Sequence, residues 1–382
     1  MKHILYLPSW FPTRRNPYPG DFIKRHAESA SLYNRITVFF TAIDETIKEP
    51  ELVEKKINGN FSVRIYYYPS GKAVLSTVIN GLKRFRALQK MYNKTFLNSS
   101  PHLVHVHVAY PAGIFALYLK KRKGLEYIIS EHDGIYMPGY DNYHWPNKFE
   151  KQMVPVIYKN AKKIHAVSKS LADALLNLKL TNTTPVVIPN VVDTNNFNYK
   201  EKERRDGFSF VHVSSLINQK NPEGMLEAVS LVKKKRNDFI VKIIGPKKEK
   251  FENLVKELSL ENEIVFMNEI TYADVAKEIS NSDAMIHFTR YETFGCVIAE
   301  SLCCGVPVIV SDLEVTRELV TDGVNGLLVT ENNVQSLADK ILYFMETGFQ
   351  INAKQVAEEN QQRFNYQRVG KMFDDLYKSI TN

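Results

Sequence analysis

Short apolar runs alternate with longer amphipathic stretches along most of the 382-residue chain. The runs have the length of strands, and the stretches between them repeat apolar residues every three or four positions, as helices do. In the first half, the predicted helices cover Asp21–Leu32, Ala112–Lys121 and Lys169–Asn177. The predicted strands there are His3–Leu7, Arg35–Phe40, Ser62–Tyr68, Leu103–Val108, Tyr127–Ser130, Lys163–Val167 and Thr184–Ile188. Strands that alternate with helices predict a parallel sheet covered on both faces.

A polar segment without apolar periodicity, 194–207, interrupts this alternation and is predicted to be a linker. The alternation then starts again, so the chain is predicted to form two α/β domains of similar size, at 1–193 and 208–365. The strands predicted in the second domain are Ser209–Ser214, Phe239–Ile244, Ile264–Met267, Ala284–Phe288, Pro307–Val310 and Gly326–Val329. Its predicted helices are Pro222–Lys233, Lys248–Leu258, Tyr272–Ser280, Gly295–Cys304, Val315–Thr321 and Asn333–Thr347, followed by a helical stretch at Ala353–Ile380.

Length and composition agree with this organisation. A chain of this length is expected to hold about two domains. The hydrophobic fraction of 44% and the charged fraction of 24% exclude a mostly disordered chain, and only 17 glycines exclude a collagen-like or low-complexity one. The three cysteines, Cys296, Cys303 and Cys304, have no metal-ligand spacing and form no disulfide framework, which favours a cytoplasmic protein. The first apolar run ends at Pro8, so it is predicted to be a strand rather than a signal peptide.

The net charge of +8 is unevenly divided. Residues 1–190 hold 27 basic and 13 acidic side chains, whereas the rest of the chain has an excess of acidic ones. Within the first half, Val74–Lys94 forms a basic amphipathic pattern, and Lys120–Lys123 adds a second basic cluster. A basic amphipathic helix can lie on an anionic membrane, so one hypothesis places this domain on the inner membrane face. The alternative is an ordinary solvated helix face. Nucleic-acid binding is not predicted, because the second half is acidic.

The clearest candidate chemistry follows the strand predicted at Ala284–Phe288. Ligands of open α/β sheets bind beyond the carboxyl ends of the strands, and two such domains place the site in the cleft between them. Glu292 lies in the turn after the strand, and Glu300 stands among apolar residues of the following helix. A buried carboxylate needs a partner, which the hydroxyl groups of a ligand can provide. The helix N-terminus at Phe294–Gly295 can hold an anion. The alternative is that both glutamates face solvent.

These segments resemble a known family. Glu292 and Glu300, followed by Gly305-Val-Pro-Val-Ile, are similar to the paired-glutamate signature of the retaining glycosyltransferases of family 4, which have the GT-B fold. Four further segments resemble the family in the same order: Ser130–Asp133, Ile188–Phe197, Val213–Asn221 and Asp322–Leu328. The resemblance implies two Rossmann-like domains that face a central cleft, with a C-terminal helix at 366–382 that crosses back to the first domain.

The resemblance also implies roles in the second domain. Glu300 would bind the ribose of a nucleotide-diphosphate sugar, and Glu292 would contact the transferred sugar. Lys220 would neutralise the leaving diphosphate, where charge builds up in the transition state. Its alternative is an exposed loop lysine, the commoner fate of this residue type. The backbone amides of Phe294 and Gly295 would contact sugar and phosphate, and the backbone near Gly245 and Ile270 would contact the base.

In the first domain, the resemblance implies that His132 contacts the donor sugar across the cleft. The alternative is a hydrogen-bonded histidine near the core. Asp133 has either a structural role or a role in binding an acceptor hydroxyl. Gly20 would let the backbone approach the diphosphate, or it would only complete a turn after two prolines. The acceptor would be a glycan or a lipid-linked molecule, in the synthesis of a cell-surface polysaccharide or glycolipid.

The sequence departs from the family pattern at two places. Ser214 and Ser215 stand where an arginine usually precedes Lys220, and Arg290 is a candidate replacement. The usual Gly-Gly pair after the strand at Pro307–Val310 is missing. Because the chain contains no Asp-x-Asp, we expect a metal-independent transfer without a cofactor. The resemblance implies that this transfer retains the anomeric configuration.

Two other functions stay open on the sequence alone. One is a sugar-nucleotide epimerase of the same fold, which would form no glycosidic bond. The other is a non-catalytic protein that binds nucleotide sugars or glycans. A dinucleotide oxidoreductase is disfavoured, since no G-x-G-x-x-G follows any predicted strand.

Overall fold

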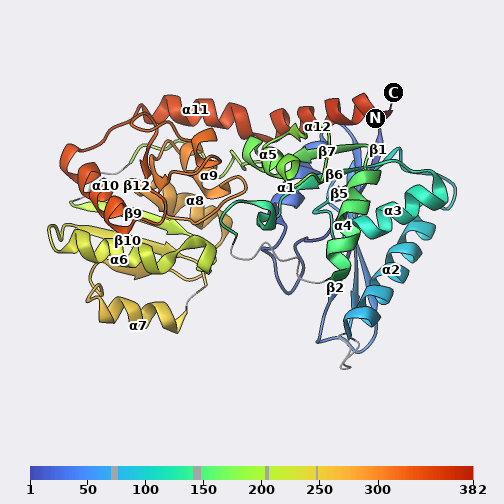
Figure 1. The fold of residues 1–382 in the computed structure, drawn as a ribbon, viewed down its shortest axis with the longest axis horizontal. Coiled ribbons are helices and arrows are strands. Elements are labelled where there is room, and N and C mark those ends of the chain that lie inside the picture. The colour runs from blue at the N-terminus through green and yellow to red at the C-terminus, as the bar shows by residue number, and fades with distance from the viewer. Residues whose placement is uncertain (70–75, 141–147, 203–205, 247, 382) are drawn as a thin grey trace.

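The computed structural model describes residues 1–69, 76–140, 148–202, 206–246 and 248–381. It contains two sheets, each with helices on both of its faces, in two domains that lie side by side (Figure 1). The N-terminal sheet has the order β3-β4-β2-β1-β5-β6-β7-β8, and all its strands are parallel except β3. These strands are β1 (His3–Pro8), β2 (Arg35–Ile43), β3 (Glu51–Lys56), β4 (Phe61–Tyr68), β5 (Leu103–His107), β6 (Tyr127–Glu131), β7 (Lys163–Ala166) and β8 (Val186–Val187).

The C-terminal sheet is parallel throughout and has the order β11-β10-β9-β12-β13-β14. Its strand order reverses between β9 and β12, which are neighbours in the sheet although two strands separate them in the sequence. Such a reversal point is where open α/β sheets bind their ligands. The strands are β9 (Phe208–Val213), β10 (Phe239–Ile244), β11 (Ile264–Phe266), β12 (Ala284–His287), β13 (Val308–Ser311) and β14 (Gly326–Val329).

Helices cover both sheets and connect most of the parallel strands. In the N-terminal domain they are α1 (Asp21–Ser31), α2 (Ser76–Thr95), α3 (Ala112–Lys123), α4 (Lys148–Asn160) and α5 (Lys169–Asn177). In the C-terminal domain they are α6 (Pro222–Lys233), α7 (Glu249–Glu257), α8 (Tyr272–Ser280), α9 (Cys296–Cys303) and α10 (Val334–Thr347). Coverage on two faces explains the continuous apolar runs in the sequence, because a strand buried on both sides has no polar face.

The end of the chain passes from the second domain back to the first. Helix α11 (Ala353–Phe364) packs on α9, and α12 (Tyr366–Thr381) packs along α1. Figure 1 shows the two helices in red along one side of both domains. Asn365 separates them with an extended backbone, so the single stretch predicted at Ala353–Ile380 is in fact two helices. The predicted α/β fold with two facing domains and a returning C-terminal helix is confirmed.

Several predicted elements differ from the structure. The edge strand β3 was not predicted, since its ELVEKK sequence is largely polar, and α4 was missed as well. The helix predicted at Val315–Thr321 is only a 3-10 turn, Thr316–Glu318. Val74, where the basic amphipathic pattern begins, lies outside the described residues. So does 203–205 of the predicted linker, and the domain boundaries stay a prediction.

Within the described part of the chain, no helix has both the length and the apolar character that crossing a bilayer requires.

The contact between α12 and α1 depends on a glycine. A Cβ atom on Gly370 would lie only 2.2 Å from the carbonyl oxygen of Ser29, so the two helices approach through the missing side chain. We expect Gly370→Ala to lower the free energy of unfolding by about 1–3 kcal/mol, the usual cost of an extra methyl group in a packed site. Urea unfolding followed by tryptophan fluorescence measures this change, since both tryptophans, Trp10 and Trp145, belong to the first half of the chain.

Gly81→Ala is the matched control. Gly81 is exposed on α2, and a Cβ atom there would meet nothing within 4 Å. This change should leave stability unchanged or raise it by up to about 1 kcal/mol through helix propensity. Equal effects of the two substitutions would contradict the role of Gly370 in docking α12.

Candidate active site in the interdomain cleft

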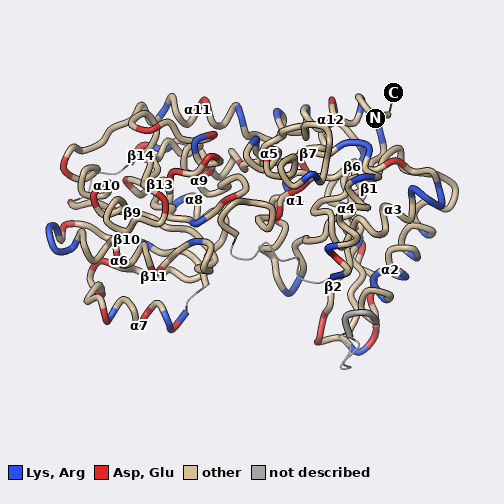
Figure 2. Tube along the Cα trace, viewed as in Figure 1, with Lys and Arg blue, Asp and Glu red and all other residues tan. Residues whose placement is uncertain are grey.

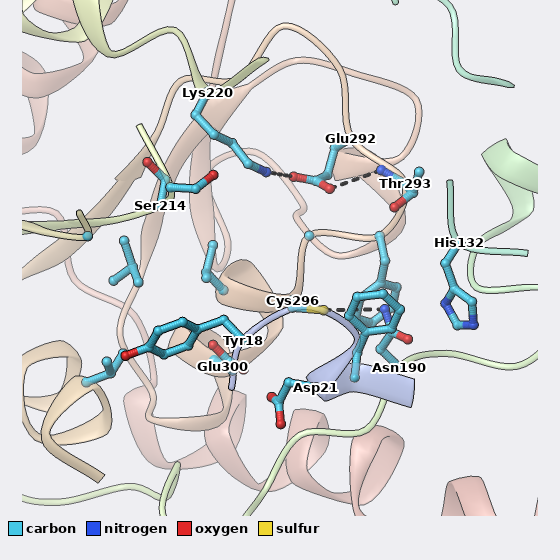
Figure 3. A pocket seen from close by; sticks show the side chains of 18 of the residues that line it. Tyr18, Asp21, His132, Asn190, Ser214, Lys220, Glu292, Thr293, Cys296 and Glu300 are labelled. Atoms are coloured by element: carbon cyan, nitrogen blue, oxygen red, sulfur yellow. Dashed lines mark hydrogen bonds and ion pairs between the residues drawn. The ribbon is translucent and has the colours of Figure 1, made fainter. Parts of the chain in front are cut away.

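A cleft of about 990 Å³ opens between the two domains, and residues from both domains line it (Figure 3). Nine of the eleven residues predicted from the sequence lie on its walls. They are His132, Asp133, Lys220, Gly245, Ile270, Glu292, Phe294, Gly295 and Glu300. Two, Gly20 and Arg290, do not. Residues that are far apart in the sequence thus meet beyond the carboxyl ends of the strands, where ligand sites were expected.

Glu292 and Lys220 form an ion pair at the reversal point of the C-terminal sheet. Lys220 ends a 3-10 turn that follows β9, and Glu292 lies in the loop that follows β12. Lys220 Nζ lies 2.5 Å from Glu292 Oε2, and the two side chains point toward one another in Figure 3. His287, at the end of β12, contacts the same oxygen at 3.2 Å through Nε2. The other oxygen, Oε1, accepts a hydrogen bond from the backbone N–H of Thr293 at 3.1 Å.

These contacts fix the charge of Glu292. Burial disfavours the ionised carboxylate, but the positive charge of Lys220 and the hydrogen bond to His287 outweigh it. Together they hold the pKa of Glu292 well below its ordinary value. Burial also lowers the pKa of His287, so this imidazole is neutral at physiological pH. Glu292 therefore stays ionised and carries no proton that it could donate.

Helix α9 begins beside this pair, with Gly295 as its N-cap residue. The first N–H groups of a helix have no partner within the helix and can bind an anion. The side chain of Phe294 is buried in the core and packs on Phe364, with ring centroids 5.7 Å apart. Phe294 and Gly295 both line the cleft, and a contact of their backbone amides with a ligand stays a prediction. Ser214 and Ser215, which stand where the family usually has an arginine before Lys220, also line the cleft.

Glu300 lies deeper on α9 and is held from both sides of the cleft. Tyr272, at the start of α8, donates a hydrogen bond to Glu300 Oε1 at 2.5 Å. Arg25, on α1 of the N-terminal domain, places Nη1 at 3.7 Å from the same oxygen. Burial raises the pKa of Glu300 to about 7, although Arg25 and Tyr272 oppose the rise. The predicted buried carboxylate is therefore real, and it has a cationic partner from the other domain.

His132 follows β6 in the opposite wall and belongs to a group of buried imidazoles. His132 Nε2 lies 3.2 Å from His107 Nδ1, and one nitrogen each of His26, His107 and His132 lie within 4.8 Å of one another. Burial, together with the neighbouring imidazoles, lowers the pKa of all three. Among the described residues, His132 Nδ1 has no hydrogen-bond partner. A neutral imidazole with a free nitrogen beside the cleft can bind a ligand hydroxyl.

The loop that carries His132 and Asp133 is tied down by a buried carboxyl, Glu131. Its Oε1 accepts hydrogen bonds from the backbone N–H groups of His132 and Asp133 at 2.8 and 3.0 Å. Its Oε2 accepts one from the hydroxyl of Tyr158 at 2.7 Å. Asp133 itself accepts a hydrogen bond from Ile135 N–H and caps the short turn that follows. One of its oxygens thus has a structural role, while the residue also lines the cleft.

Gly20 and Arg290 are placed differently from the expectation. Gly20 caps α1 with φ +74°, and a Cβ atom there would lie 2.5 Å from the carbonyl oxygen of Trp10. The turn and the packing on Trp10 explain this glycine, while its neighbour Asp21 lines the cleft. Arg290 is not among the lining residues. Its guanidinium binds Asn218, Asn221 and Asn332, so it holds the loop behind Lys220 instead of replacing the missing arginine.

Comparison with known proteins assigns this arrangement. Residues 29–196 match the family model "Glycosyltransferase Family 4", and residues 193–363 match "Glycosyl transferases group 1". The chain belongs to the group 1 glycosyltransferases. This glycosyltransferase is 29% identical over 281 residues to an uncharacterised glycosyltransferase of Methanocaldococcus jannaschii, which covers 71% of this chain and 75% of that protein.

Solved structures of the same fold cover almost the whole glycosyltransferase. A sucrose-phosphate synthase from Thermosynechococcus elongatus superposes with a TM-score of 0.78 at 17% identity, over 99% of both chains. Anabaena HepE, solved in complex with UDP and glucose, superposes with a TM-score of 0.76 at 18% identity, over 99% of this chain and 100% of that one. These similarities show the GT-B fold.

Three residues of the glycosyltransferase site were not predicted from its sequence: Arg25, Tyr272 and His287. Arg25 lies one turn after Asp21 on α1, and nothing in the local pattern distinguishes it from an exposed helical arginine. Tyr272 begins a helix that was predicted, but its direction toward Glu300 depends on how α8 packs against α9. His287 ends the strand before Glu292, and the strand-end argument that selected His132 could have found it as well.

The raised pKa of Glu300 makes a prediction for the stability of the glycosyltransferase. Between the unfolded pKa of 4.5 and the folded value of about 7, the folded state binds more protons than the unfolded state. This carboxyl therefore stabilises the fold less as the pH rises through that window. In Glu300→Gln this loss is absent. Between pH 5 and pH 8, the free energy of unfolding of this variant should therefore fall by about 2 kcal/mol less than that of the wild type.

Urea unfolding at the two pH values measures the difference. Glu257→Gln is the control, because Glu257 is exposed on α7 and should keep the wild-type pH dependence. If the free energy of unfolding changed equally with pH in the wild type and in Glu300→Gln, the raised pKa of Glu300 would be contradicted.

Proposed function

We propose that this glycosyltransferase transfers a hexosyl unit from a nucleotide-diphosphate sugar to a glycan or lipid-linked acceptor, with retained anomeric configuration and without a metal ion. The observation that carries the proposal is the Lys220–Glu292 pair, placed beside the N-terminus of α9 and in the same cleft as Glu300. One wall thus offers a cation, amide donors for phosphate and two carboxylates for hydroxyl groups. The product would belong to a cell-surface polysaccharide or a glycolipid.

The donor would lie along the C-terminal wall. Glu300 would accept hydrogen bonds from the ribose hydroxyls, and the backbone near Gly245 and Ile270 would contact the base. Lys220 and the first N–H groups of α9 would hold the diphosphate, so the protein itself supplies the positive charge that a metal ion would otherwise provide. The solved HepE complex with UDP and glucose supports a nucleotide donor for this fold.

The chemistry begins with the departure of the diphosphate from the anomeric carbon. Negative charge grows on the leaving phosphate oxygen, and the positive charge of Lys220 would stabilise it most strongly in the transition state. The acceptor oxygen forms the new bond on the same face, and its proton passes to that phosphate oxygen. Glu292 is ionised and paired with Lys220, so it acts through its charge on the developing positive carbon and not as an acid. A nucleophilic carboxylate of the glycosidase type is therefore not required.

His132 would act from the opposite wall. Because burial keeps its imidazole neutral, it can exchange a hydrogen bond with a sugar hydroxyl without adding a positive charge next to the reacting carbon. Asp133, beside it in the same loop, would contact an acceptor hydroxyl with the oxygen that does not cap the turn.

Loss of the Glu292 charge tests the proposed chemistry. With the nucleotide sugar that the enzyme accepts, Glu292→Gln should reduce kcat by about 10²–10³-fold, the usual cost of removing one preorganised electrostatic contact. Binding of the nucleoside diphosphate, followed by thermal shift, should persist. Glu358→Gln, an exposed change on α11, should keep the wild-type rate.

The outcome also separates the alternatives. A new glycosidic bond with retained configuration, seen by NMR, supports the proposal, while an inverted product contradicts it. Conversion of the nucleotide sugar without an acceptor would indicate an epimerase. Full activity after treatment with a chelator is expected for a metal-independent enzyme. The absence of a shift with any nucleoside diphosphate or nucleotide sugar would contradict donor binding, since a ligand at 100 times its Kd adds about 2.7 kcal/mol of stability.

We further propose that the N-terminal domain meets its acceptor at an anionic membrane surface on the cytoplasmic side. Figure 2 shows Lys and Arg residues along α2 and at the end of α3. On α2, Ile79 and Leu82 are 38% and 54% exposed, next to the basic residues Lys83 and Arg86. Exposed apolar side chains flanked by basic ones are typical of a helix that lies on a membrane.

Vesicle sedimentation tests this surface. The enzyme should bind vesicles rich in phosphatidylglycerol at low salt and should bind neutral phosphatidylcholine vesicles much more weakly. Replacing Lys83, Arg86 and Lys90 by glutamine should weaken binding about 100-fold, at about 1 kcal/mol for each basic residue near the surface. A triple change at exposed lysines of the C-terminal domain, Lys234, Lys235 and Lys256 to glutamine, is the control. Equal binding to both kinds of vesicle would refute the membrane role.

A further inference from the structure

Arg25 is a cation of the N-terminal wall that reaches the carboxylate of the other wall. Its side chain is 7% exposed, and its Nη1 lies 2.9 Å from Asp21 Oδ2 and 3.7 Å from Glu300 Oε1. The same nitrogen donates a hydrogen bond to the hydroxyl of Tyr272, and the guanidinium lies over the Tyr272 ring, 4.9 Å from its centroid. Arg25 is therefore held in one position next to Glu300, and it is itself a lining residue of the cleft.

At least one donor of the guanidinium has no partner in the part of the chain that the structure describes. Within the described residues, Arg25 Nε is buried and has no hydrogen-bond partner. A buried N–H group without a partner costs about 1–3 kcal/mol, so the site gains when a ligand oxygen accepts this bond. An arginine has only donors, and an ionised carboxylate has only acceptors. Arg25 and Glu300 thus offer opposite hydrogen-bonding partners at one place in the cleft.

A vicinal diol fits this pair. Each hydroxyl of a ribose can donate one hydrogen bond and accept others, so one diol can donate to Glu300 and accept from Arg25. We propose that Arg25 completes the ribose site from the N-terminal domain and makes the enzyme select ribonucleotides over 2′-deoxyribonucleotides. This inference rests on the proposed function, which places the ribose at Glu300.

The alternative is a purely structural arginine that only joins the two domains. Such a residue would strengthen the binding of every nucleotide alike, because it would act by closing the cleft. A residue that contacts the diol would act on one hydroxyl and would change the ratio between ribo and deoxyribo ligands. A site built to hydrogen-bond a hydroxyl rejects an analogue without it, because its buried polar groups are then left unpaired. The ratio of affinities therefore separates the two roles.

The experiment compares ADP, CDP, GDP and UDP with their 2′-deoxy forms by isothermal titration calorimetry on the full-length protein. For the base that binds best, the wild type should prefer the ribo form at least 10-fold. In Arg25→Gln, this preference should fall to within about threefold, chiefly through weaker binding of the ribo form. Arg122→Gln is the matched control: it makes the same change at an exposed arginine of the same domain, away from the cleft, and should keep the wild-type ratio.

Each outcome decides a separate point. If the wild type binds none of the nucleotides, the proposed function fails. If it binds the ribo and 2′-deoxy forms equally, the function stands and the role of Arg25 is refuted. A proportional loss for both forms in Arg25→Gln also refutes it, in favour of a structural arginine. Should Arg25→Gln not fold, as judged by circular dichroism, Arg25→Lys replaces it: the charge remains but the planar fork is lost, and the preference should again fall.

Discussion

The cost of burying negative charge governs the cleft. Two carboxylates, Glu292 and Glu300, are almost fully enclosed, and a buried charge is stable only with a partner. The two are balanced in different ways. Glu292 has its cation, Lys220, within the same domain, so it is ionised whatever the other domain does. Glu300 depends on Arg25 from the opposite domain and keeps a raised pKa even with it. One carboxylate is thus preorganised, while the other is sensitive to how the domains meet.

This difference matches the two tasks of a transferase site. In the proposed reaction, the Lys220–Glu292 pair would supply fixed charge, because rearranging charges during the reaction would cost energy. Glu300 would recognise the donor in the same proposal, because a carboxyl that gains new hydrogen bonds on binding would increase selectivity. The imidazoles on the opposite wall add shape and hydrogen bonds without charge, since burial keeps His26, His107 and His132 neutral.

The sequence predicts the fold well for a physical reason. Parallel strands covered on both faces must be continuously apolar, and β1, β5 and β6 show that pattern, whereas the polar edge strand β3 does not and was missed. The glutamates were predictable because Glu292 lies in the turn after a strand and Glu300 stands among the apolar residues of the helix that follows. Arg25 was not, because its role comes from a contact between two domains. Arg290 was misplaced because closeness to Glu292 in the sequence does not tell where a long side chain points.

The path of the chain has a mechanical consequence. It leaves the N-terminal domain once, near Val192, and returns once, between α11 and α12. The two crossings are joined by a hydrogen bond from Val192 N–H to the carbonyl oxygen of Phe364 at 2.9 Å. The two segments that connect the domains are therefore held together at one place. Because both covalent connections between the domains run through this one junction, the position of Arg25 opposite Glu300 depends on the geometry of that junction.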